Sequence, residues 1–491
     1  MSDEDGVTAA TAHREGPDTA IALIEPLVFI ENRTFDEIDI GETASLARTL
    51  SREDIELFAV MSGDVNPAHL DEEYAHSDMF HKIIAHGMWG AALISALLGT
   101  RLPGPGTIYL EQTLRFRRPV TLGDTITVSV TATAKDPERH RISFDCRCEN
   151  QRGEGVIDGV AEVIAPTEKV RRPRVALPDV RLHEHRVLFR DLLLRAKTLE
   201  PVRMAVVHPV DRDSLLGAVQ AAQEGLIVPV LVGPESRIRS VADAHEIAIS
   251  DLELIATEHS HEAARRAVEL ASRGQVQALM KGAVSTEELM HAAVVPGKGL
   301  LTDRRMSHVS VIEVPSYPRP LFITDAALNV EPDLAAKRDI VQNAIDLAVA
   351  VGVAKPKVAI LSALETVNPR LRSSLEAAVL AKMAERGQIH GAIVDGPFQF
   401  DNAVSASAAR SKGIASRVAG QADIVVVPDL ESGGMLVQQL DYLGDSHSAG
   451  IALGGRVPIA ISSRAASALE RVTSCALAVL IARTPAQRKP E

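Results

Sequence analysis

From about residue 183 onward, the chain sets short apolar runs between longer amphipathic stretches. Runs such as Met204–Val207, Lys357–Ser362 and Asp423–Val427 are too short to be helices, whereas Leu334–Val351 and Ser373–Arg386 have helical length and periodicity. Short runs that are apolar throughout indicate strands buried on both faces, as in a parallel sheet covered by helices. We therefore expect an α/β region here, with ligands beyond the carboxyl ends of its strands.

The residues before position 166 follow a different pattern. Four strand-like segments follow one another at residues 107–116, 124–134, 141–149 and 155–164. They are preceded by Ala85–Gly99, which is apolar nearly all round and predicts a buried helix. One long buried helix with several antiparallel strands predicts an α+β domain.

These two patterns divide the chain into four parts. Residues 1–22 are small and polar and predict a disordered tail. The α+β domain is expected over 23–165 and the α/β domain over 183–491. Between them, residues 166–182 are basic and marked by prolines, which predicts a linker.

Composition excludes several classes of protein. A chain of 491 residues with a formal charge of −13 has no basic stripe, so nucleic acid is not an expected partner. We expect no signal peptide or membrane span. Three cysteines indicate a reducing cytoplasm, and Cys146 and Cys148 are expected as buried thiols because no second pair completes a zinc site. We expect no metal and no cofactor.

Asp64 and His69 lie on either side of Asn66-Pro67. Because Pro67 disfavours helical geometry at Asn66, the segment predicts a helix end followed by a turn. Both side chains then project to one side, where they can hold one water molecule and move its protons. A turn with an acid/base pair beside a buried helix indicates an active site.

The motifs around this turn resemble those of the MaoC-like, (R)-specific enoyl-CoA hydratases, a hot-dog family. The run Ser62–Asp71 reads Ser-Gly-Asp-Val-Asn-Pro-Ala-His-Leu-Asp, His86–Met88 reads His-Gly-Met, and Pro119–Asp124 reads Pro-Val-Thr-Leu-Gly-Asp. The resemblance covers nearly all of residues 30–165. It implies a hot-dog fold and hydration of a 2-enoyl thioester.

The resemblance also implies the roles of individual residues. Asp64 and His69 are the dyad that activates water, and which of them gives and which takes the proton is left open. Gly87 offers its main-chain N–H to the thioester oxygen, and Ser95 orients Asp64. Asn66 is expected among the substrate-binding residues. From the residues themselves, Trp89, Asp71, His76, His81 and His86 are expected to be structural.

The second region is similar to the phosphate acetyl/butyryltransferases. The resembling segments are 230–234, 280–283, 306–309, 322–327, 342–346, 395–397, 427–431 and 463–464. They imply two α/β subdomains with a cleft between them, and the reaction of acyl-CoA with phosphate to give acyl phosphate and CoA.

That chemistry needs a cation for phosphate and a donor for the thioester oxygen. Arg464 is the expected phosphate or CoA ligand, because its planar guanidinium matches phosphate oxygens, and Ser463 is expected to polarise the carbonyl. Further expected cleft residues are Lys281, Arg304, Arg305, Ser307 and Glu470, the last as an alternative base.

Three of the departures from the transferase pattern bear on the expected activity. Ser285 stands where we expect histidine, Gly434 where we expect asparagine, and Ala466 where we expect aspartate. Gly434 and Ala466 both fall beside the expected site. These departures keep an alternative open, in which the second region binds acyl-CoA or CoA without turnover and regulates the hydratase or its assembly.

The sequence as a whole resembles bifunctional enoyl-CoA hydratase/phosphate acetyltransferase proteins. The expected fold is an α+β hot-dog domain followed by an α/β phosphate acetyl/butyryltransferase-like domain of two subdomains. The expected partners are acyl-CoA, CoA and phosphate. A cytoplasmic homo-oligomer is expected, since hot-dog domains usually pair.

Overall fold

The computed structural model describes residues 29–175, 180, 187–463 and 465–484, and the chain separates into two units, Met1–Leu182 and His183–Glu491. The tail expected over residues 1–22 lies outside the described residues. Among the helices of the described residues, none is long and apolar enough to cross a bilayer.

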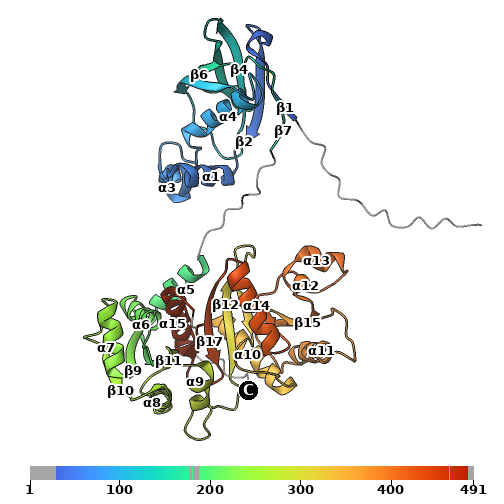
Figure 1. Cartoon of the computed structure of the whole chain (residues 1–491). Helices are drawn as coiled ribbons and strands as arrows, with labels where there is room; N and C mark the ends of the chain where they lie inside the picture. The colour runs from blue at the N-terminus through green and yellow to red at the C-terminus, as the bar shows by residue number, and fades with distance from the viewer. Residues whose placement is uncertain (1–28, 176–179, 181–186, 464, 485–491) are drawn as a thin grey trace, which may run out of the picture. The chain divides into compact units, whose positions relative to one another are not determined.

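The first unit is built on a five-stranded antiparallel sheet in the order β2-β4-β5-β6-β3 (Figure 1). The strands of the whole first unit are β1 (Phe29–Glu31), β2 (Thr43–Thr49), β3 (Ile108–Phe116), β4 (Thr125–Asp136), β5 (Arg141–Glu149), β6 (Gly155–Ile164) and β7 (Arg171–Pro173). Its helices are η1 (Phe35–Glu37), α1 (Arg52–Ser62), α2 (Pro67–Leu70), α3 (Glu72–Ser77) and α4 (Gly87–Thr100). The four strands expected from the sequence are β3 to β6, so that prediction is confirmed. With α4 packed against β2 and β4, this is the expected hot-dog arrangement.

The core of the first unit joins α4 to the sheet. Ile94 and Leu97 of α4 are fully buried in one cluster with Val128 and Phe144 of the strands. The helix is not buried all round, however, and that part of the prediction is wrong. Met88 is 56% exposed, and Ala92, Ser95, Ala96 and Gly99 are also exposed. The reason is that the sheet covers a single face of α4.

The three cysteines are free and buried, which confirms the expectation for Cys146 and Cys148. Cys146 and Cys148 share one face of β5, where burial raises the pKa of Cys146 to about 11 and that of Cys148 to about 12. Both therefore stay protonated and pack as small apolar side chains.

The segment expected as a linker over residues 166–182 contains a strand. Arg171–Pro173 form β7, which pairs antiparallel with β1, so that Phe29 lies opposite Pro173. The Asn32 side chain also bonds to this segment, donating to the Glu168 carbonyl at 2.8 Å and accepting from the Val170 N–H at 2.9 Å. The first part of the expected linker is therefore bound to the start of the described chain.

The second unit contains an 11-stranded sheet in the order β10-β9-β8-β11-β18-β17-β12-β13-β16-β14-β15. Its strands are β8 (Val202–Val207), β9 (Ile227–Gly233), β10 (Glu253–Ala256), β11 (Ala278–Lys281), β12 (Ser307–Glu313), β13 (Leu321–Thr324), β14 (Lys357–Leu361), β15 (Ile393–Phe398), β16 (Ile424–Val426), β17 (His447–Leu453) and β18 (Ile459–Ala460). Its helices are α5 (Val187–Lys197), α6 (Arg212–Gln223), α7 (Glu235–Ala244), α8 (Ser260–Ser272), α9 (Thr286–Ala293), α10 (Leu334–Ala350), α11 (Arg372–Glu385), α12 (Phe400–Val404), α13 (Ala406–Ser411), α14 (Leu430–Leu443) and α15 (Ala468–Arg483).

The sheet of the second unit is mixed, which corrects the expectation of a purely parallel sheet. Strand β12 is antiparallel to both β13 and β17, and β17 is antiparallel to β18. A short connection such as the one between β12 and β13 can join only antiparallel neighbours. The result is two runs of parallel strands that point in opposite directions, one for each expected subdomain, within one continuous sheet.

Helices cover both faces of this sheet (Figure 1). On β8, Met204 and Val206 point into a core shared with α5, α6, α10 and α15, whereas Ala205 and Val207 point into a core shared with α8 and α9. This alternation of two apolar faces along one strand confirms that these short runs are buried on both sides.

Candidate active sites

The Asp64–His69 turn is formed by signals in its own sequence. Helix α1 ends at Gly63, which takes a left-handed conformation with φ 74°, and α2 begins at Pro67. Proline suits the first helical position because its missing N–H has no partner there. The side chain of Asn66 caps α2 by accepting from the Ala68 N–H at 3.1 Å. The chain therefore turns between Asp64 and His69 as expected.

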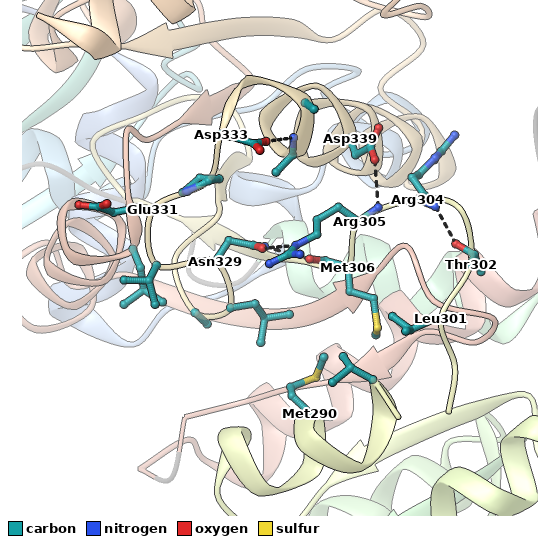
Figure 2. A pocket seen from close by; sticks show the side chains of 18 of the residues that line it. Met290, Leu301, Thr302, Arg304, Arg305, Met306, Asn329, Glu331, Asp333 and Asp339 are labelled. Atoms are coloured by element: carbon teal, nitrogen blue, oxygen red, sulfur yellow. Dashed lines mark hydrogen bonds between the residues drawn. The ribbon is translucent and has the colours of Figure 1, made fainter. Parts of the chain in front are cut away.

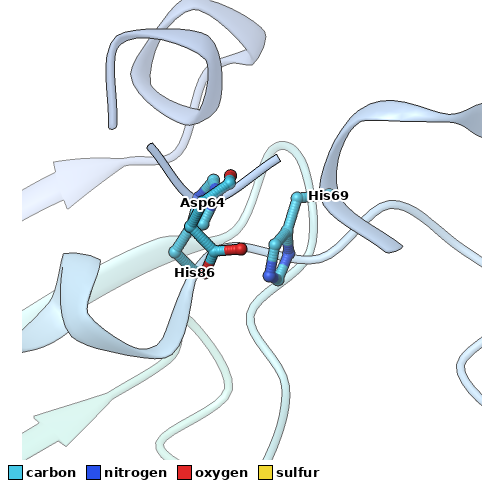
Figure 3. A group of neighbouring side chains, drawn as sticks. All are labelled: Asp64, His69 and His86. Carbon is cyan, nitrogen blue, oxygen red and sulfur yellow. The ribbon is translucent and has the colours of Figure 1, made fainter. Parts of the chain in front are cut away.

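This turn brings together three side chains, two of which the sequence singled out. The potential ligand atoms of Asp64, His69 and His86 all lie within 4.8 Å of one another (Figure 3). His69 and His86 are 9% and 3% exposed, whereas Asp64 is exposed. A carboxylate and two imidazoles thus meet at one point of the first unit.

The tautomers of the two imidazole rings follow from their hydrogen-bond contacts. His69 Nδ1 lies 2.9 Å from the Ile84 carbonyl, and His86 Nε2 lies 3.0 Å from the Asp64 carbonyl. A carbonyl oxygen only accepts, so both ring nitrogens donate. In the neutral rings, His69 Nε2 and His86 Nδ1 therefore carry the lone pairs. His86 also fixes the Asp64 main chain, a contact that our structural interpretation of His86 did not anticipate.

Gly87 is the first residue of α4, directly after His86. The N–H groups of the first helical turn have no intrahelical acceptor, and the positive end of the helix dipole lies there. A Cβ atom on Gly87 would lie 3.2 Å from Phe116 Cε1, so the position is closely packed. The Gly87 N–H is therefore available to a substrate oxygen at a point where negative charge is stabilised.

A cavity of about 320 Å³ adjoins these groups. Its lining residues are His69, Phe80, Ile84, Ala85, His86, Gly87, Trp89, Gly90, Phe116, Arg117, Arg118, Pro119, Val120 and Ile157. Most of these side chains are apolar, with two imidazoles on one side and two arginines among the rest. Such a lining suits an acyl chain with a reactive polar group at one end.

Ser95 and Asn66 are not part of this cluster. Ser95 lies eight residues beyond Gly87 on α4, which is roughly 12 Å along the helix, and no described contact joins it to Asp64. Its orienting role stays a prediction. The Asn66 side chain is occupied as the cap of α2, and its substrate-binding role is likewise a prediction.

The second unit contains a larger pocket, of about 1120 Å³ (Figure 2). It is lined by α9, by residues 301–306 before β12, and by residues 327–339 after β13. Both basic and acidic side chains line this pocket, among them His291, Asp303, Arg304, Arg305, Glu331, Asp333, Arg338 and Asp339. A pocket of this size and polarity suits a large charged ligand.

Arg305 is held at the centre of this pocket by a chain of hydrogen bonds (Figure 2). Its Nε donates to Asn329 Oδ1 at 2.7 Å, and Asn329 Nδ2 donates to Asp325 Oδ2 at 2.5 Å. Its main-chain N–H donates to Asp339 Oδ2 at 3.0 Å. Because the guanidinium is fixed through Nε, its two terminal nitrogens remain for a phosphate.

The other residues expected in the transferase cleft have local partners. Arg304 Nη1 forms an ion pair with Asp346 at 2.5 Å. Ser307 is fully buried and accepts from Asn343 Nδ2 at 2.8 Å. Lys281 is 3% exposed, with Nζ 3.2 Å from the Val284 carbonyl. Arg304 lines the large pocket with Arg305, whereas Ser307 and Lys281 do not.

Ser463 and Lys281 lie close to each other but away from Arg305. Arg471 is buried and connects them, because it donates to the main-chain carbonyls of both at 3.3 Å. Strands β11 and β18, which precede Lys281 and Ser463, run opposite to β13. The carboxyl ends of these strands therefore face opposite edges of the sheet, and the described residues do not form the single cleft we expected. Arg464 lies outside the described residues.

Glu470 has a structural function in the described chain. Its carboxylate accepts from the Ser467 N–H at 2.7 Å and from Ser467 Oγ at 2.9 Å, which completes a capping box at the start of α15. A carboxylate held in this way stabilises the helix. Its role as an alternative base is a prediction that the geometry does not favour.

Two of the departures from the transferase pattern have a local structural context. Ser285 caps α9 by accepting from the Glu288 N–H at 3.0 Å. Gly434 follows Gly433, whose Cβ position would lie 2.9 Å from the Asp325 carbonyl oxygen. Helix α14 therefore passes close to the Asp325 backbone at Gly433, while Gly434 has ordinary space. Ala466 is 7% exposed.

Comparisons with known proteins match the two units of the chain to two different families. Residues 255–479 match the family described as phosphate acetyl/butaryl transferase, and residues 37–151 match the MaoC like domain. A phosphate acetyltransferase of Rickettsia felis is 56% identical over 294 residues, which are 60% of this chain and 84% of that protein.

Two solved structures correspond to the two units. A branched-chain phosphotransacylase from Enterococcus faecalis is 26% identical, with a TM-score of 0.50, over 57% of this chain and 99% of its own. An R-hydratase from Pseudomonas aeruginosa is 44% identical, with a TM-score of 0.31, over 32% of this chain and 99% of its own. The chain belongs to the phosphate acetyl/butyryltransferase family and carries a MaoC-like hot-dog domain before the region shared with that family.

Proposed function

We propose that this protein is a bifunctional enzyme acting on CoA thioesters. The first unit hydrates a trans-2-enoyl-CoA to the (R)-3-hydroxyacyl-CoA, and the second unit transfers an acyl group from acyl-CoA to phosphate. The observation that carries the hydratase assignment is the meeting of Asp64 and His69 beside the free N–H of Gly87. The transferase assignment is supported by the phosphate acetyltransferase relative and by the fixed arginine of the large pocket.

Hydration adds the hydroxyl group of water to C3 of the enoyl thioester and a proton to C2. Water held between the Asp64 carboxylate and His69 Nε2 gives up its proton as its oxygen attacks C3. Negative charge then develops on the thioester oxygen, where the Gly87 N–H donates to it, and one such donor contributes about 3 kcal/mol. The dyad contributes about 10²–10⁴-fold, with the division of acid and base roles left open.

In the second reaction, a phosphate oxygen attacks the thioester carbonyl and the CoA thiolate leaves and takes up a proton. The two terminal nitrogens of Arg305 suit phosphate oxygens, of either the free phosphate or CoA. Ser463 and Arg464 are assigned to the carbonyl and the phosphate by resemblance alone. No observation on the described residues favours the non-catalytic alternative.

Two assays on the purified full chain test both assignments. The first follows loss of the enoyl absorbance of crotonyl-CoA, and the second follows phosphate-dependent release of CoA from acetyl-CoA or butyryl-CoA. We expect both activities. If CoA release stays at background while CoA still binds, the transferase assignment is wrong.

Three further features belong to this proposal. A homo-oligomer is supported by the exposed small and apolar residues of α4, which a second copy would cover. A cytoplasmic location is supported by three free, buried cysteines. Neither reaction as written needs a cofactor, since water and phosphate are the only co-substrates.

A further inference from the structure

The cluster of Asp64, His69 and His86 has the composition of a metal site. It offers one carboxylate oxygen and two imidazole nitrogens, with the potential ligand atoms within 4.8 Å of one another (Figure 3). Two histidines and one carboxylate are a recurrent ligand set for zinc in sites that leave a fourth position open. The hydratase reaction as proposed uses only two of these three side chains, so His86 is left without a chemical role.

The lone pairs of the two imidazoles are directed by their outer contacts. His69 donates through Nδ1 to the Ile84 carbonyl, and His86 donates through Nε2 to the Asp64 carbonyl. Histidines that bind metals typically donate their other ring N–H to a carbonyl or carboxylate, which fixes the tautomer and the ring. Both rings already have this arrangement before any ion binds.

His86 Nδ1 is the observation that points to a ligand. The ring is 3% exposed, and Nδ1 is buried without a hydrogen-bond partner among the described residues. A buried acceptor without a partner is costly, so a ligand that takes up this lone pair is stabilised. The rings of His69 and His86 lie only 4.0 Å apart between centroids, so the two imidazoles are direct neighbours.

The geometry requires little movement for an ion to bind. With zinc–nitrogen and zinc–oxygen bonds of about 2.0–2.2 Å, tetrahedral ligand atoms lie about 3.3–3.6 Å apart. One potential ligand atom from each of the three side chains lies within 4.8 Å of the others, and Asp64 is exposed on a turn. Imidazole and carboxylate ligands also favour zinc over calcium or magnesium.

We propose that Zn²⁺ binds to the Asp64 carboxylate, His69 Nε2 and His86 Nδ1, and that it reversibly inhibits the hydratase. In the proposed metal-free reaction, the Asp64 carboxylate and His69 Nε2 hold the attacking water. Zn²⁺ binds to the same two groups, so hydration stops while the ion is bound. Zinc is here an inhibitor and not a cofactor. The inhibition rests on the proposed hydratase function, whereas the binding of the ion does not.

The first experiment measures binding without any activity. The full chain is freed of metal with a chelator and titrated with Co²⁺, whose visible absorption reports nitrogen and oxygen ligands, and Zn²⁺ is then used to displace it. We expect the His86→Gln and Asp64→Asn variants to bind at least tenfold more weakly, since even changes to outer contacts cost about 10–100-fold in metal affinity. The matched control is His76→Gln, because His76 is an exposed histidine of α3 outside the cluster.

Asp64→Asn keeps the proposal testable if His86→Gln does not fold, because Asp64 is exposed and the substitution preserves shape. Wild-type affinity in both variants, or equal losses in the His76→Gln control, would show that the ion binds elsewhere and overturn the proposal.

The second experiment measures hydration of crotonyl-CoA by the wild-type chain in phosphate-free buffer with Zn²⁺ and then with excess chelator. Hydration releases no thiol, so the CoA group does not remove the zinc during the reaction. We expect at least a tenfold loss of rate that the chelator reverses. An unchanged or higher rate at saturating Zn²⁺ contradicts inhibition. A chain that hydrates nothing in the absence of metal contradicts both the proposed hydratase function and the inhibition, while the Co²⁺ titration still decides whether the ion binds.

Discussion

His69 Nδ1 donates to the main-chain carbonyl of Ile84 at 2.9 Å. This contact fixes the ring from a segment 15 residues away, it leaves Nε2 with the lone pair in the neutral ring, and His69 lines the cavity. A ring held in one tautomer can exchange a proton with a bound water without first reorienting. In the proposed hydratase reaction, the Ile84 main chain therefore helps to position His69.

The first prediction concerns Asp64. Asp64→Asn should lower the rate of crotonyl-CoA hydration by about 10²–10⁴-fold, because the amide can neither take up nor give up a proton in the reaction. Phosphate-dependent CoA release by the same sample should not change. Glu73→Gln on α3 removes another exposed carboxylate and should retain full hydration. A near-normal rate in Asp64→Asn would remove the dyad from the mechanism.

The second prediction concerns Arg305. Arg305→Gln should lower kcat/KM for phosphate-dependent CoA release at least tenfold, because a hydrogen bond between charged groups contributes about 1.5–3 kcal/mol. Hydration should be unaffected, which makes it the internal control. Arg265→Gln on α8 removes an exposed arginine and serves as the matched variant. Equal CoA release by the two variants would place phosphate binding away from the large pocket.

The third prediction concerns Gly90 on α4. A Cβ atom there would lie 2.5 Å from Ile157 Cδ1, whereas Ile157 Cγ1 is 3.8 Å away. Gly90→Ala should therefore destabilise the first unit by about 1–3 kcal/mol, despite the better helix propensity of alanine. Ile157→Val removes Cδ1, so in that background Gly90→Ala should be neutral or stabilising.

Urea unfolding of the four chains in this cycle measures the coupling between Gly90 and Ile157. If Gly90→Ala destabilises equally in both backgrounds, the close contact is not the cause.

The fourth prediction concerns pH and His208. Burial, together with the nearby Arg237, lowers the pKa of His208 below its usual 6.5, against the opposite effects of Glu288 and Asp211. The unfolded chain then binds a proton near pH 6.5 that the folded chain does not bind, so stability is present above that pH and falls as the pH drops below it. The slope is about 1.4 kcal/mol per pH unit for each such histidine.

Calorimetry of the second unit between pH 7 and pH 5 measures this slope. His208 has φ 58°, a left-handed conformation that asparagine tolerates, so His208→Asn is the suitable variant. We expect a shallower slope than in the wild type. Buried His308 also has a pKa lowered mainly by desolvation, so part of the slope should remain. Identical slopes in both proteins would assign the pH dependence to other groups.

Local signals in the sequence predicted the first site well. The helix end before the Asp64–His69 turn follows from Pro67, which disfavours helical geometry at Asn66. The contact of His86 with the Asp64 carbonyl joins residues 22 positions apart, and no local signal reports it. Its position directly before Gly87 was the available clue.

The second unit shows why strand direction is harder to predict. Strand β17 contains Gly450 in its middle and gave no strand signal, although it lies in the centre of the sheet. Strand β17 is antiparallel to both of its neighbours, so β18 and β12 run in the same direction, and the two runs of parallel strands reverse at β12 and β13. Our expectation that Ser463 and Arg305 share one cleft failed because β18 and β13 therefore end at opposite edges of the sheet.

The pairing of β1 with β7 has a consequence for how the first unit can be handled as a protein. The segment that leads into the hot-dog sheet and the segment that leads out of it are hydrogen-bonded to each other, with Phe29 opposite Pro173. Because its two ends pair with each other, the module is closed by its own main chain. We therefore expect residues 29–175 to be expressible as one cassette.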